Sequence, residues 1–204
     1  MGSVYDLRGT HGSGKSHVVH TILKTYEHWP IVEYEGQLEW RLEPDMAQLE
    51  KQKAATRLGY FLPEIDLGII GDYSKVCGGC DGIKTADEVV RRIRLFSRNF
   101  ERTLLEGVLV AHTFTRYKDL ALELGNYHFL FLDTPLPTCI SRVRARRWAK
   151  GNEKPLDPKN VARDHARTQR RLPAEFAAAG CATVRIRWRN SVAGVLAAMG
   201  VAAP

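Results

Sequence analysis

The sequence lacks any apolar run close to the roughly 20 residues that a membrane-spanning helix needs. A cleaved signal peptide is not expected either, because the chain reaches a glycine-rich loop as early as Gly9. Its cysteines are too few for a disulfide scaffold in a chain of 204 residues: Cys77, Cys80, Cys139 and Cys181. Internal repeats and low-complexity segments are also missing. We therefore expect a cytoplasmic protein with reduced thiols and no membrane partner.

The glycine-rich loop fits the phosphate-binding pattern Gly-x-x-x-x-Gly-Lys-Ser/Thr over residues 9–16. A strand-like run at 3–7 precedes it, and residues 16–23 have the apolar spacing of a helix packed on a sheet. In this order, backbone N–H groups turn toward an anion at the positive end of the helix. The alternative is a glycine-rich turn that matches by chance. We expect the nucleotide, ATP, to be bound by Gly12, Ser13, Gly14, Lys15, Ser16 and His17.

Two residues of this loop have expected roles of their own. Lys15 is expected to reach the β- and γ-phosphates and to act in catalysis, and the hydroxyl of Ser16 is expected to bind Mg²⁺.

Strand-like and helical runs alternate along the chain, and 44% of the residues are apolar, enough to bury a full core. We therefore expect one domain over residues 1–204, with an α/β P-loop NTPase fold. Its parallel five-stranded sheet would have helices on both faces and an Arg-rich helical lid at about 138–171. The expected strands are at 3–7, 30–34, 67–72, 103–110, 129–133 and 184–188. One helix is expected to begin after Thr85, which would cap it, and another is expected over 191–199. Residues around 46–58 have helical composition.

Three carboxylates lie within or just after buried apolar runs, where ligands gather in parallel α/β sheets. Phosphoryl transfer to an alcohol needs one carboxylate to orient the hydroxyl and another group to position the metal. We assign the first role to Asp72 and the magnesium shell, directly or through water, to Glu106, although the two can exchange roles. For Asp133 we expect a helix-entry role. Each can instead be a carboxylate that caps a helix or pairs with an arginine.

The positive charge of the chain is concentrated between residues 142 and 171. This segment holds eleven basic and three acidic residues, a net charge of +8, whereas the whole chain carries +7. Arg142 and Arg146 are four apart on one predicted helix and can face the transferred phosphoryl group together, so we expect both in catalysis. Residues 151–155 form a plausible hinge, and a second basic helix at 160–171 would follow. The alternative is a solvated amphipathic face.

The pair Cys77 and Cys80 lies in a glycine-containing loop, but no second pair completes a zinc site. The glycines favour a tight loop whose backbone approaches a ligand, with Asp81 as its polar contact. An ordinary turn, or metal or redox chemistry, are the alternatives.

Together these motifs resemble the P-loop kinases of the nucleotide kinase group. The resemblance includes the loop at 9–16, the run Leu-Leu-Glu-Gly at 104–107 and the passage from Asp133 to Arg147. The segments 70–74 and 77–83 look like those of bacteriophage-type kinases labelled thymidylate or deoxynucleotide kinases, which include 5-hydroxymethylpyrimidine DNA kinases. That likeness implies that Asp72 faces the acceptor hydroxyl and that the base is bound by Tyr73, Gly78, Gly79, Cys80 and Asp81. An Asp-Arg-Tyr type motif, as in ordinary thymidylate kinases, is not evident after Glu106.

Our leading hypothesis is an ATP-dependent kinase that acts on 5-hydroxymethyluracil or 5-hydroxymethylcytosine in DNA during phage DNA hypermodification. The basic segment would neutralise DNA phosphates, and the acceptor base would be flipped out of the stack, with Trp148 or Trp188 available for stacking. One alternative is a kinase for free deoxynucleoside monophosphates. Another is an NTPase that uses hydrolysis as a switch.

Overall fold

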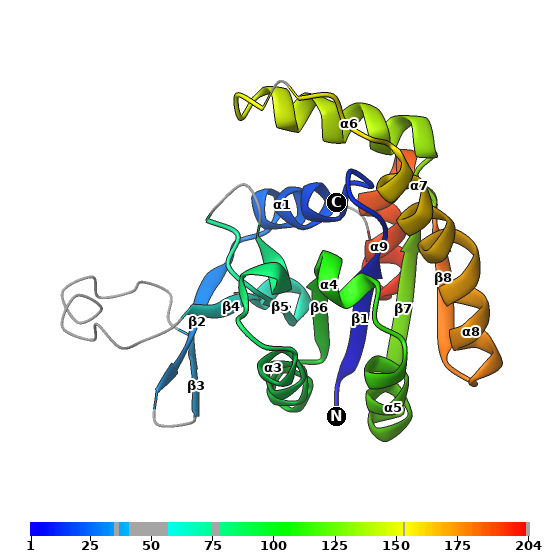
Figure 1. The fold of residues 1–204 in the computed structure, drawn as a ribbon. Coiled ribbons are helices and arrows are strands. Elements are labelled where there is room, and N and C mark those ends of the chain that lie inside the picture. Colours follow the sequence, from blue (N-terminus) through cyan, green and yellow to red (C-terminus); the bar gives the residue numbers. More distant parts are fainter. Residues whose placement is uncertain (35–36, 41–56, 75–77, 153, 203–204) are drawn as a thin grey trace.

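The computed structural model, which describes residues 1–34, 37–40, 57–74, 78–152 and 154–202, is built around one sheet (Figure 1). In the described part the sheet has eight strands in the order β3-β2-β4-β5-β6-β1-β7-β8. Their bounds are β1 (Ser3–Arg8), β2 (Trp29–Tyr34), β3 (Gln37–Trp40), β4 (Arg57–Leu62), β5 (Leu67–Ile70), β6 (Arg102–Glu106), β7 (Tyr127–Leu132) and β8 (Ala182–Ile186).

The α/β class is confirmed, but the prediction of a purely parallel five-stranded sheet is wrong. Strands β5, β6, β1, β7 and β8 pair in parallel, whereas β3, β2 and β4 extend the sheet by antiparallel pairing. Of the antiparallel strands, β2 corresponds to the strand expected at 30–34, whereas β3 and β4 were not expected. The helix expected around residues 46–58 lies mostly outside the described residues, and Arg57 and Leu58 belong to β4.

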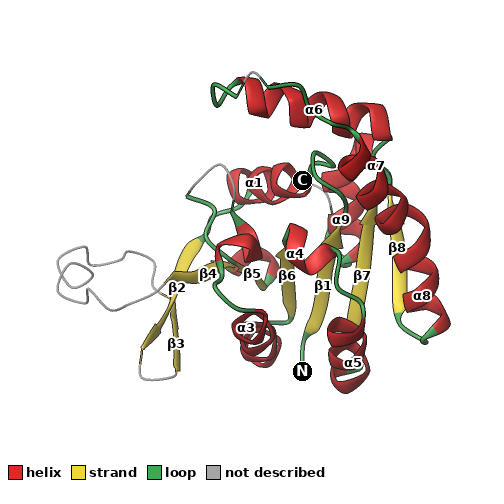
Figure 2. Ribbon diagram, in the orientation of Figure 1, coloured by secondary structure: helices red, strands yellow, loops and turns green. Residues whose placement is uncertain are grey.

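Helices cover both faces of the sheet, as expected (Figure 2). One face packs against α1 and α9 through the cluster that contains Val18, Ile22 and Val195. The other packs against α3, α5 and α8 through the cluster that contains Phe96 and Phe176. The helical segments are α1 (Lys15–Thr25), α3 (Ala86–Asn99), α4 (Val108–Ala111), α5 (Thr115–Leu124), α6 (Leu136–Trp148), α7 (Lys159–Ala166), α8 (Leu172–Ala178) and α9 (Ser191–Ala198), with short turns η1 (Pro63–Ile65), η2 (Gly79–Gly82), η4 (Trp188–Asn190) and the π-helical turn η3 (Arg167–Arg171).

One expected strand is shorter than predicted. β6 ends at Glu106, and the helical turn α4 follows Gly107, although the sequence predicted a strand over 103–110. A short apolar run does not by itself distinguish a buried strand from a buried helical turn. The early end of β6 places Glu106 at the carboxyl edge of the sheet.

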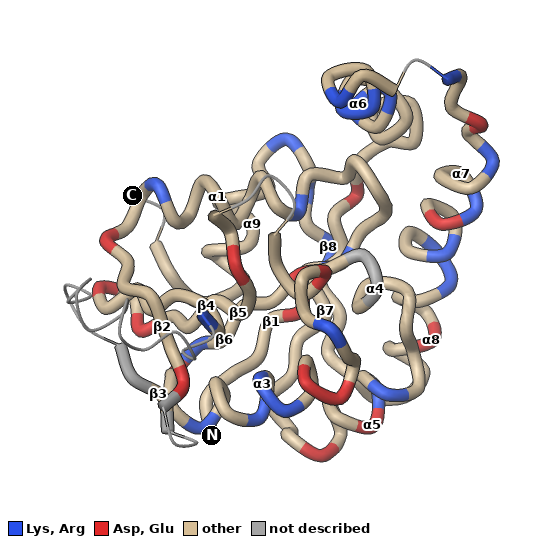
Figure 3. Tube along the Cα trace, turned by 60° about the vertical axis from the view of Figure 1, so that its left-hand side comes forward, with Lys and Arg blue, Asp and Glu red and all other residues tan. Residues whose placement is uncertain are grey.

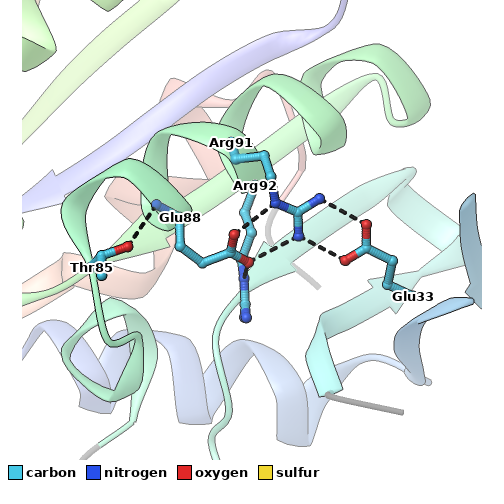
Figure 4. A network of polar contacts seen from close by, with 5 residues as sticks. All are labelled: Glu33, Thr85, Glu88, Arg91 and Arg92. Carbon is cyan, nitrogen blue, oxygen red and sulfur yellow. Dashed lines mark hydrogen bonds and ion pairs between the residues drawn. The ribbon is translucent and has the colours of Figure 1, made fainter. Parts of the chain in front are cut away.

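The start of α3 confirms the predicted cap and fixes this helix to the sheet extension. Thr85 Oγ1 accepts a hydrogen bond from Glu88 N, at 3.1 Å (Figure 4). The Glu88 carboxylate binds Arg91 and Arg92, and Arg91 also binds Glu33 of β2 through both of its terminal nitrogens. These contacts connect the antiparallel part of the sheet to the helix that covers its parallel part.

The predicted lid corresponds to α6, α7 and η3. In Figure 1, α6 extends above α1, and α7 returns along the side of the sheet toward α8. Lysines and arginines recur along α6 and α7 (Figure 3). Among all helices of the described part, none has both the length and the apolar character needed to cross a bilayer.

Candidate active site

The glycine-rich loop connects β1 to α1, as the sequence predicted. Gly12 and Gly14 have positive φ angles of 76° and 103°, and α1 begins directly at Lys15. A Cβ atom at Gly12 would lie 2.4 Å from Cys139 O of α6, so a larger residue does not fit there. The loop therefore passes close beneath the first lid helix.

A cavity of about 410 Å³ opens above this loop. Residues 11–17 line it together with Gly78, Asp81, Glu106, Arg142 and Arg146. The structure thus brings together the six residues predicted to bind the nucleotide, two of the predicted substrate residues and four of the five predicted catalytic residues. His11 also lines the cavity. It lies within the loop pattern at 9–16, but no role was predicted for it.

Lys15 is the buried cation of the cavity. Its Nζ donates hydrogen bonds to Gly9 O at 2.9 Å and Thr10 O at 3.4 Å, and 5% of the residue is exposed. Burial lowers the pKa of Lys15 below its ordinary value, while the negative charges of Glu106 and Asp81 oppose this shift. A polyphosphate in the cavity would supply further negative charge beside this ammonium group.

Glu106 joins the loop to the end of β6. Its Oε1 accepts a hydrogen bond from Ser16 Oγ at 2.9 Å and a weaker one from Tyr73 OH at 3.4 Å. Burial raises the pKa of Glu106, and Lys15 and the Ser16 hydrogen bond act in the opposite direction. A carboxylate and a hydroxyl at this distance suit a hard cation that takes its other ligands from phosphate and water.

The η2 turn brings a second carboxylate, Asp81, into the cavity. Gly79 of this turn has φ 74°, and a Cβ atom there would lie 2.6 Å from Glu106 O and 2.7 Å from Glu106 Oε1. A Cβ atom at Gly107 would lie 3.1 Å from Asp81 Oδ1. Close packing against β6 therefore holds Asp81 over the carboxyl edge of the sheet.

The other residues predicted to bind the base are placed differently. Tyr73 and Cys80 are 5% and 3% exposed and, like Gly79, do not line the cavity. Gly79 and Cys80 belong to the η2 turn itself, and burial raises the pKa of the Cys80 thiol. Cys77 lies outside the described residues, and the three described cysteines are free.

Asp72 does not line the cavity, in contrast to its predicted position at the acceptor. Its carboxylate accepts hydrogen bonds from Ser74 N and Ser74 Oγ, both at 3.0 Å, and from Tyr60 OH at 3.3 Å. Arg57 lies 3.7 Å away. Burial tends to raise the pKa of Asp72, but the hydrogen bonds from Ser74 and the charge of Arg57 lower it overall. These contacts fit the alternative interpretation, a carboxylate that pairs with an arginine.

Arg142 connects the lid helix to the loop. Its Nη1 lies 3.4 Å from Gly12 O and 3.3 Å from Ser13 O, and its guanidinium carbon lies 5.6 Å from the centre of the Trp188 ring. Arg146, one turn further along α6, also lines the cavity. Both arginines therefore line one cavity, as their four-residue spacing allows, and that they face a phosphoryl group stays a prediction. Asp133 does not line the cavity, and its carboxylate accepts a hydrogen bond from Trp188 N at 2.7 Å. The side chain of Trp148 is 70% exposed.

A buried ion pair beneath the loop was not predicted. Arg8, the last residue of β1, binds Asp6 Oδ2 through Nε at 2.9 Å and Nη2 at 2.7 Å, and both side chains are fully buried. Arg8 Nη1 also donates to Thr113 O at 2.9 Å, and the guanidinium lies over the rings of Phe129 and Phe176. Because Asp6 and Arg8 are two residues apart on one strand, the sequence indicates that both side chains lie on the same face of the sheet. It does not indicate that this face is buried.

Comparison with known proteins identifies relatives of this chain. A "5-hmdU DNA kinase" of Pseudomonas phage PaMx11 is 31% identical over 161 residues, which are 78% of this chain and 77% of the relative. The chain belongs to the 5-hmdU DNA kinase family. Proteins of the same name from Pseudomonas phage M6 and Delftia phage PhiW-14 are 29% and 28% identical, over 62% and 78% of this chain. The match covers 68% of the M6 protein and 58% of the PhiW-14 protein.

No family model matches the chain. A gluconokinase from Sinorhizobium meliloti has a similar structure, with 18% identity, a TM-score of 0.43 and coverage of 98% of this chain and 91% of the gluconokinase. Membership of the 5-hmdU DNA kinase family confirms the resemblance found in the sequence and shows that the protein is a kinase, an enzyme of the phosphotransferase class.

Proposed function

We propose that this protein transfers the γ-phosphate of ATP to the hydroxymethyl group of a 5-hydroxymethylated pyrimidine in DNA, with 5-hydroxymethyluracil as the acceptor base. The observation that carries the proposal is the identity with a 5-hmdU DNA kinase along most of both chains. The cavity supports it, because a phosphate-binding loop, a buried lysine and two lid arginines meet there with two carboxylates.

On the donor side, residues 12–17 bind the triphosphate and Lys15 neutralises its terminal phosphates. The described residues contain no group of three or more His, Cys, Asp and Glu side chains arranged to hold a metal. Two oxygen donors are present, Ser16 Oγ and the Glu106 carboxylate, and Mg²⁺ prefers oxygen ligands. They fit a Mg²⁺ ion that is brought in by the nucleotide and takes its other ligands from phosphate and water. Such an ion would neutralise the charge that develops on the transferred phosphoryl group.

On the acceptor side, Asp81 is the carboxylate that orients the hydroxymethyl group and accepts its proton. Glu106 is already bound by Ser16 and Tyr73, and Asp72 lies outside the cavity. Asp81 lines the cavity together with Lys15 and the lid arginines. Arg142 and Arg146 meet the equatorial charge of the phosphoryl group, and α6 above them excludes water that would hydrolyse the nucleotide.

A DNA acceptor also agrees with the distribution of charge. The segment 142–171 has a net charge of +8 and starts with Arg142 at the cavity. Its lysines and arginines recur along α6 and α7 (Figure 3). Lysine and arginine contacts to DNA phosphates give binding that weakens steeply with salt. The acceptor base must leave the stack to reach a cavity that lies behind α6.

The test is phosphoryl transfer from radiolabelled ATP to a panel of acceptors. The panel contains oligonucleotides with and without 5-hydroxymethyluracil, free 5-hydroxymethyl-2′-deoxyuridine monophosphate and thymidine monophosphate. Label is expected in the hydroxymethylated oligonucleotide, at a rate that falls steeply as salt is raised. Preferential labelling of a free monophosphate would instead identify a nucleotide kinase, and ATP hydrolysis that no acceptor stimulates would identify a switch NTPase.

A further inference from the structure

A second cavity lies on the side of α7, apart from the lining of the cavity above the glycine-rich loop, which we call the phosphate cavity. Its volume is about 780 Å³, larger than the 410 Å³ of the phosphate cavity. One wall consists of the turn after α4 and the start of α5, which contribute His112 and Arg116. The other wall is η3, which contributes Arg167 and Arg171. We call this cavity the strand groove.

The strand groove presents three guanidinium groups from two separate elements. Arg116 pairs with Asp87, and Arg171 pairs with Glu175 at 2.7 Å. In the part of the chain that the structure describes, no acidic side chain lies within ion-pair distance of Arg167. Asp119 and Glu175 also line the groove, so its lining has three arginines and two carboxylates.

The two existing ion pairs do not prevent these arginines from binding an anion. Arg116 and Arg171 have side chains that are 44% and 71% exposed, and Asp87 is 85% exposed. Ion pairs this exposed contribute little stability, because water competes for both partners. A phosphate group can therefore exchange for the carboxylate, and the planar guanidinium group binds it through two parallel hydrogen bonds.

His112 lines the strand groove, and the next residue, Thr113, accepts a backbone hydrogen bond from Arg8, which ends β1 directly before the glycine-rich loop. On the opposite wall, Gln169 of η3 donates a hydrogen bond to Leu132 O at the end of β7. Both walls are thus attached to the carboxyl edge of the sheet, the edge at which the phosphate cavity also opens. Within the described residues, the buried Nε2 atom of His112 has no hydrogen-bond partner, so the groove has a polar atom available for a ligand.

We propose that the strand groove binds the sugar–phosphate backbone of the DNA strand whose flipped base enters the phosphate cavity. Arg116, Arg167 and Arg171 would contact phosphates next to the acceptor nucleotide, and His112 Nε2 would face the backbone where it turns toward the cavity. This inference rests on the proposed function, because it needs DNA as the acceptor. It adds the site on the protein that distinguishes a nucleotide within a strand from a free one.

The position of the groove favours a nucleic acid over other anionic partners. Arg167 and Arg171 belong to the segment with the net charge of +8, and this segment starts at the phosphate cavity with Arg142. A partner that follows the segment must carry negative charges repeated along its length and must also deliver a hydroxyl group into the cavity. A hydroxymethylated DNA strand meets both requirements.

The test compares the variants Arg167→Ala and Arg167→Ala/Arg171→Ala with Arg98→Ala. Arg98 is an exposed arginine near the end of α3, away from the groove, so the control removes the same charge at a distant site. For each protein, KM and kcat are measured with an oligonucleotide that contains one 5-hydroxymethyluracil and with free 5-hydroxymethyl-2′-deoxyuridine monophosphate. KM for ATP and the salt dependence of oligonucleotide binding by fluorescence anisotropy are measured in parallel.

We expect Arg167→Ala to raise KM for the oligonucleotide about 5- to 10-fold, and the double variant to raise it further. The slope of log K against log salt should fall by about 1 for each DNA phosphate that the variant no longer neutralises. KM for ATP and turnover of the free nucleotide should stay within about twofold of the parent protein, as should all properties of Arg98→Ala.

Equal effects of Arg167→Ala and Arg98→Ala on the oligonucleotide would overturn the groove assignment, because they would show an effect of overall charge. Parent-like KM in the double variant would also overturn it while leaving DNA phosphorylation by the parent protein intact. If the parent protein phosphorylates only free nucleotides, the proposed function itself fails, and the groove assignment fails with it.

Discussion

Replacing Asp81 and Asp72 separately by asparagine tests which carboxylate faces the acceptor. Asp81 lines the phosphate cavity with Lys15 and Arg146, so Asp81→Asn removes the carboxylate that we propose as the acceptor of the hydroxyl proton. Loss of a positioned general base costs about 10²- to 10⁴-fold in kcat, which corresponds to about 3–5 kcal/mol at 1.36 kcal/mol per tenfold change. KM for ATP should change less than about threefold.

Asp72→Asn should have a different and smaller effect. Asp72 is 43% exposed, and its contacts are the 3.7 Å ion pair with Arg57 and hydrogen bonds from Ser74 and Tyr60. An exposed ion pair contributes about 0–1 kcal/mol, and asparagine keeps one oxygen that can accept hydrogen bonds. We therefore expect a loss of about 1 kcal/mol or less in the free energy of unfolding, with kcat within about threefold of the parent protein.

The assay is steady-state transfer to a 5-hydroxymethyluracil oligonucleotide, with ATP binding measured separately and unfolding by urea as a control for folding. A larger drop in kcat for Asp72→Asn than for Asp81→Asn, with both proteins folded, would refute the assignment of Asp81. Equal losses of ATP binding and transfer in Asp81→Asn would place Asp81 with the magnesium ligands instead.

Further predictions concern the loop, the ion pair beneath it and the η2 turn. Lys15→Met should abolish detectable ATP binding by calorimetry while the circular dichroism spectrum stays unchanged; retained turnover would contradict the loop assignment. Arg8→Met should lower the free energy of unfolding in urea by about 3–5 kcal/mol, because it leaves the buried Asp6 carboxylate without its cation, and a loss below about 1 kcal/mol would show that the pair is not important for stability. Gly79→Ala should reduce transfer more than tenfold with a melting temperature several degrees lower, because its Cβ atom would lie 2.6 Å from Glu106 O; parent-like activity would show that the turn can shift freely.

The phosphate-binding part of the site could be predicted from the sequence because its residues are local. The strand, the loop at 9–16 and the helix occur in one continuous segment, and the spacing of Gly14, Lys15 and Ser16 fixes which backbone groups face the anion. Glu106 could be predicted as well, since it interrupts an apolar run and the carboxyl ends of parallel strands share one edge. Arg142 and Arg146 follow from a four-residue spacing on a helix.

The acceptor side could be predicted only in part because it depends on the path of a loop. Asp72 and Asp81 both follow β5, and nothing in their spacing shows which one turns into the cavity. The path of the loop is set by the close approach of Gly79 to Glu106, which places Asp81 in the cavity. These two residues are 27 positions apart in the sequence, so their approach is not visible in the local pattern. The same limit applies to β4, whose residues pair with β2 across more than 20 positions of sequence. It applies also to the burial of the pair Asp6 and Arg8, which depends on helices packed against the sheet.

The measurement that tests the central claim most directly locates the transferred phosphate on the DNA. An oligonucleotide with one 5-hydroxymethyluracil and blocked 5′ and 3′ ends is incubated with the protein, magnesium and ATP, then digested by a nuclease to 5′-mononucleotides without any phosphatase and analysed by mass spectrometry. We expect 5-hydroxymethyl-2′-deoxyuridine monophosphate that carries a second phosphate group on its hydroxymethyl oxygen, and this product should be absent with the Lys15→Met protein. Recovery of 5-hydroxymethyl-2′-deoxyuridine monophosphate without the second phosphate, under conditions in which the same protein phosphorylates a free deoxynucleoside monophosphate, would contradict the proposed function.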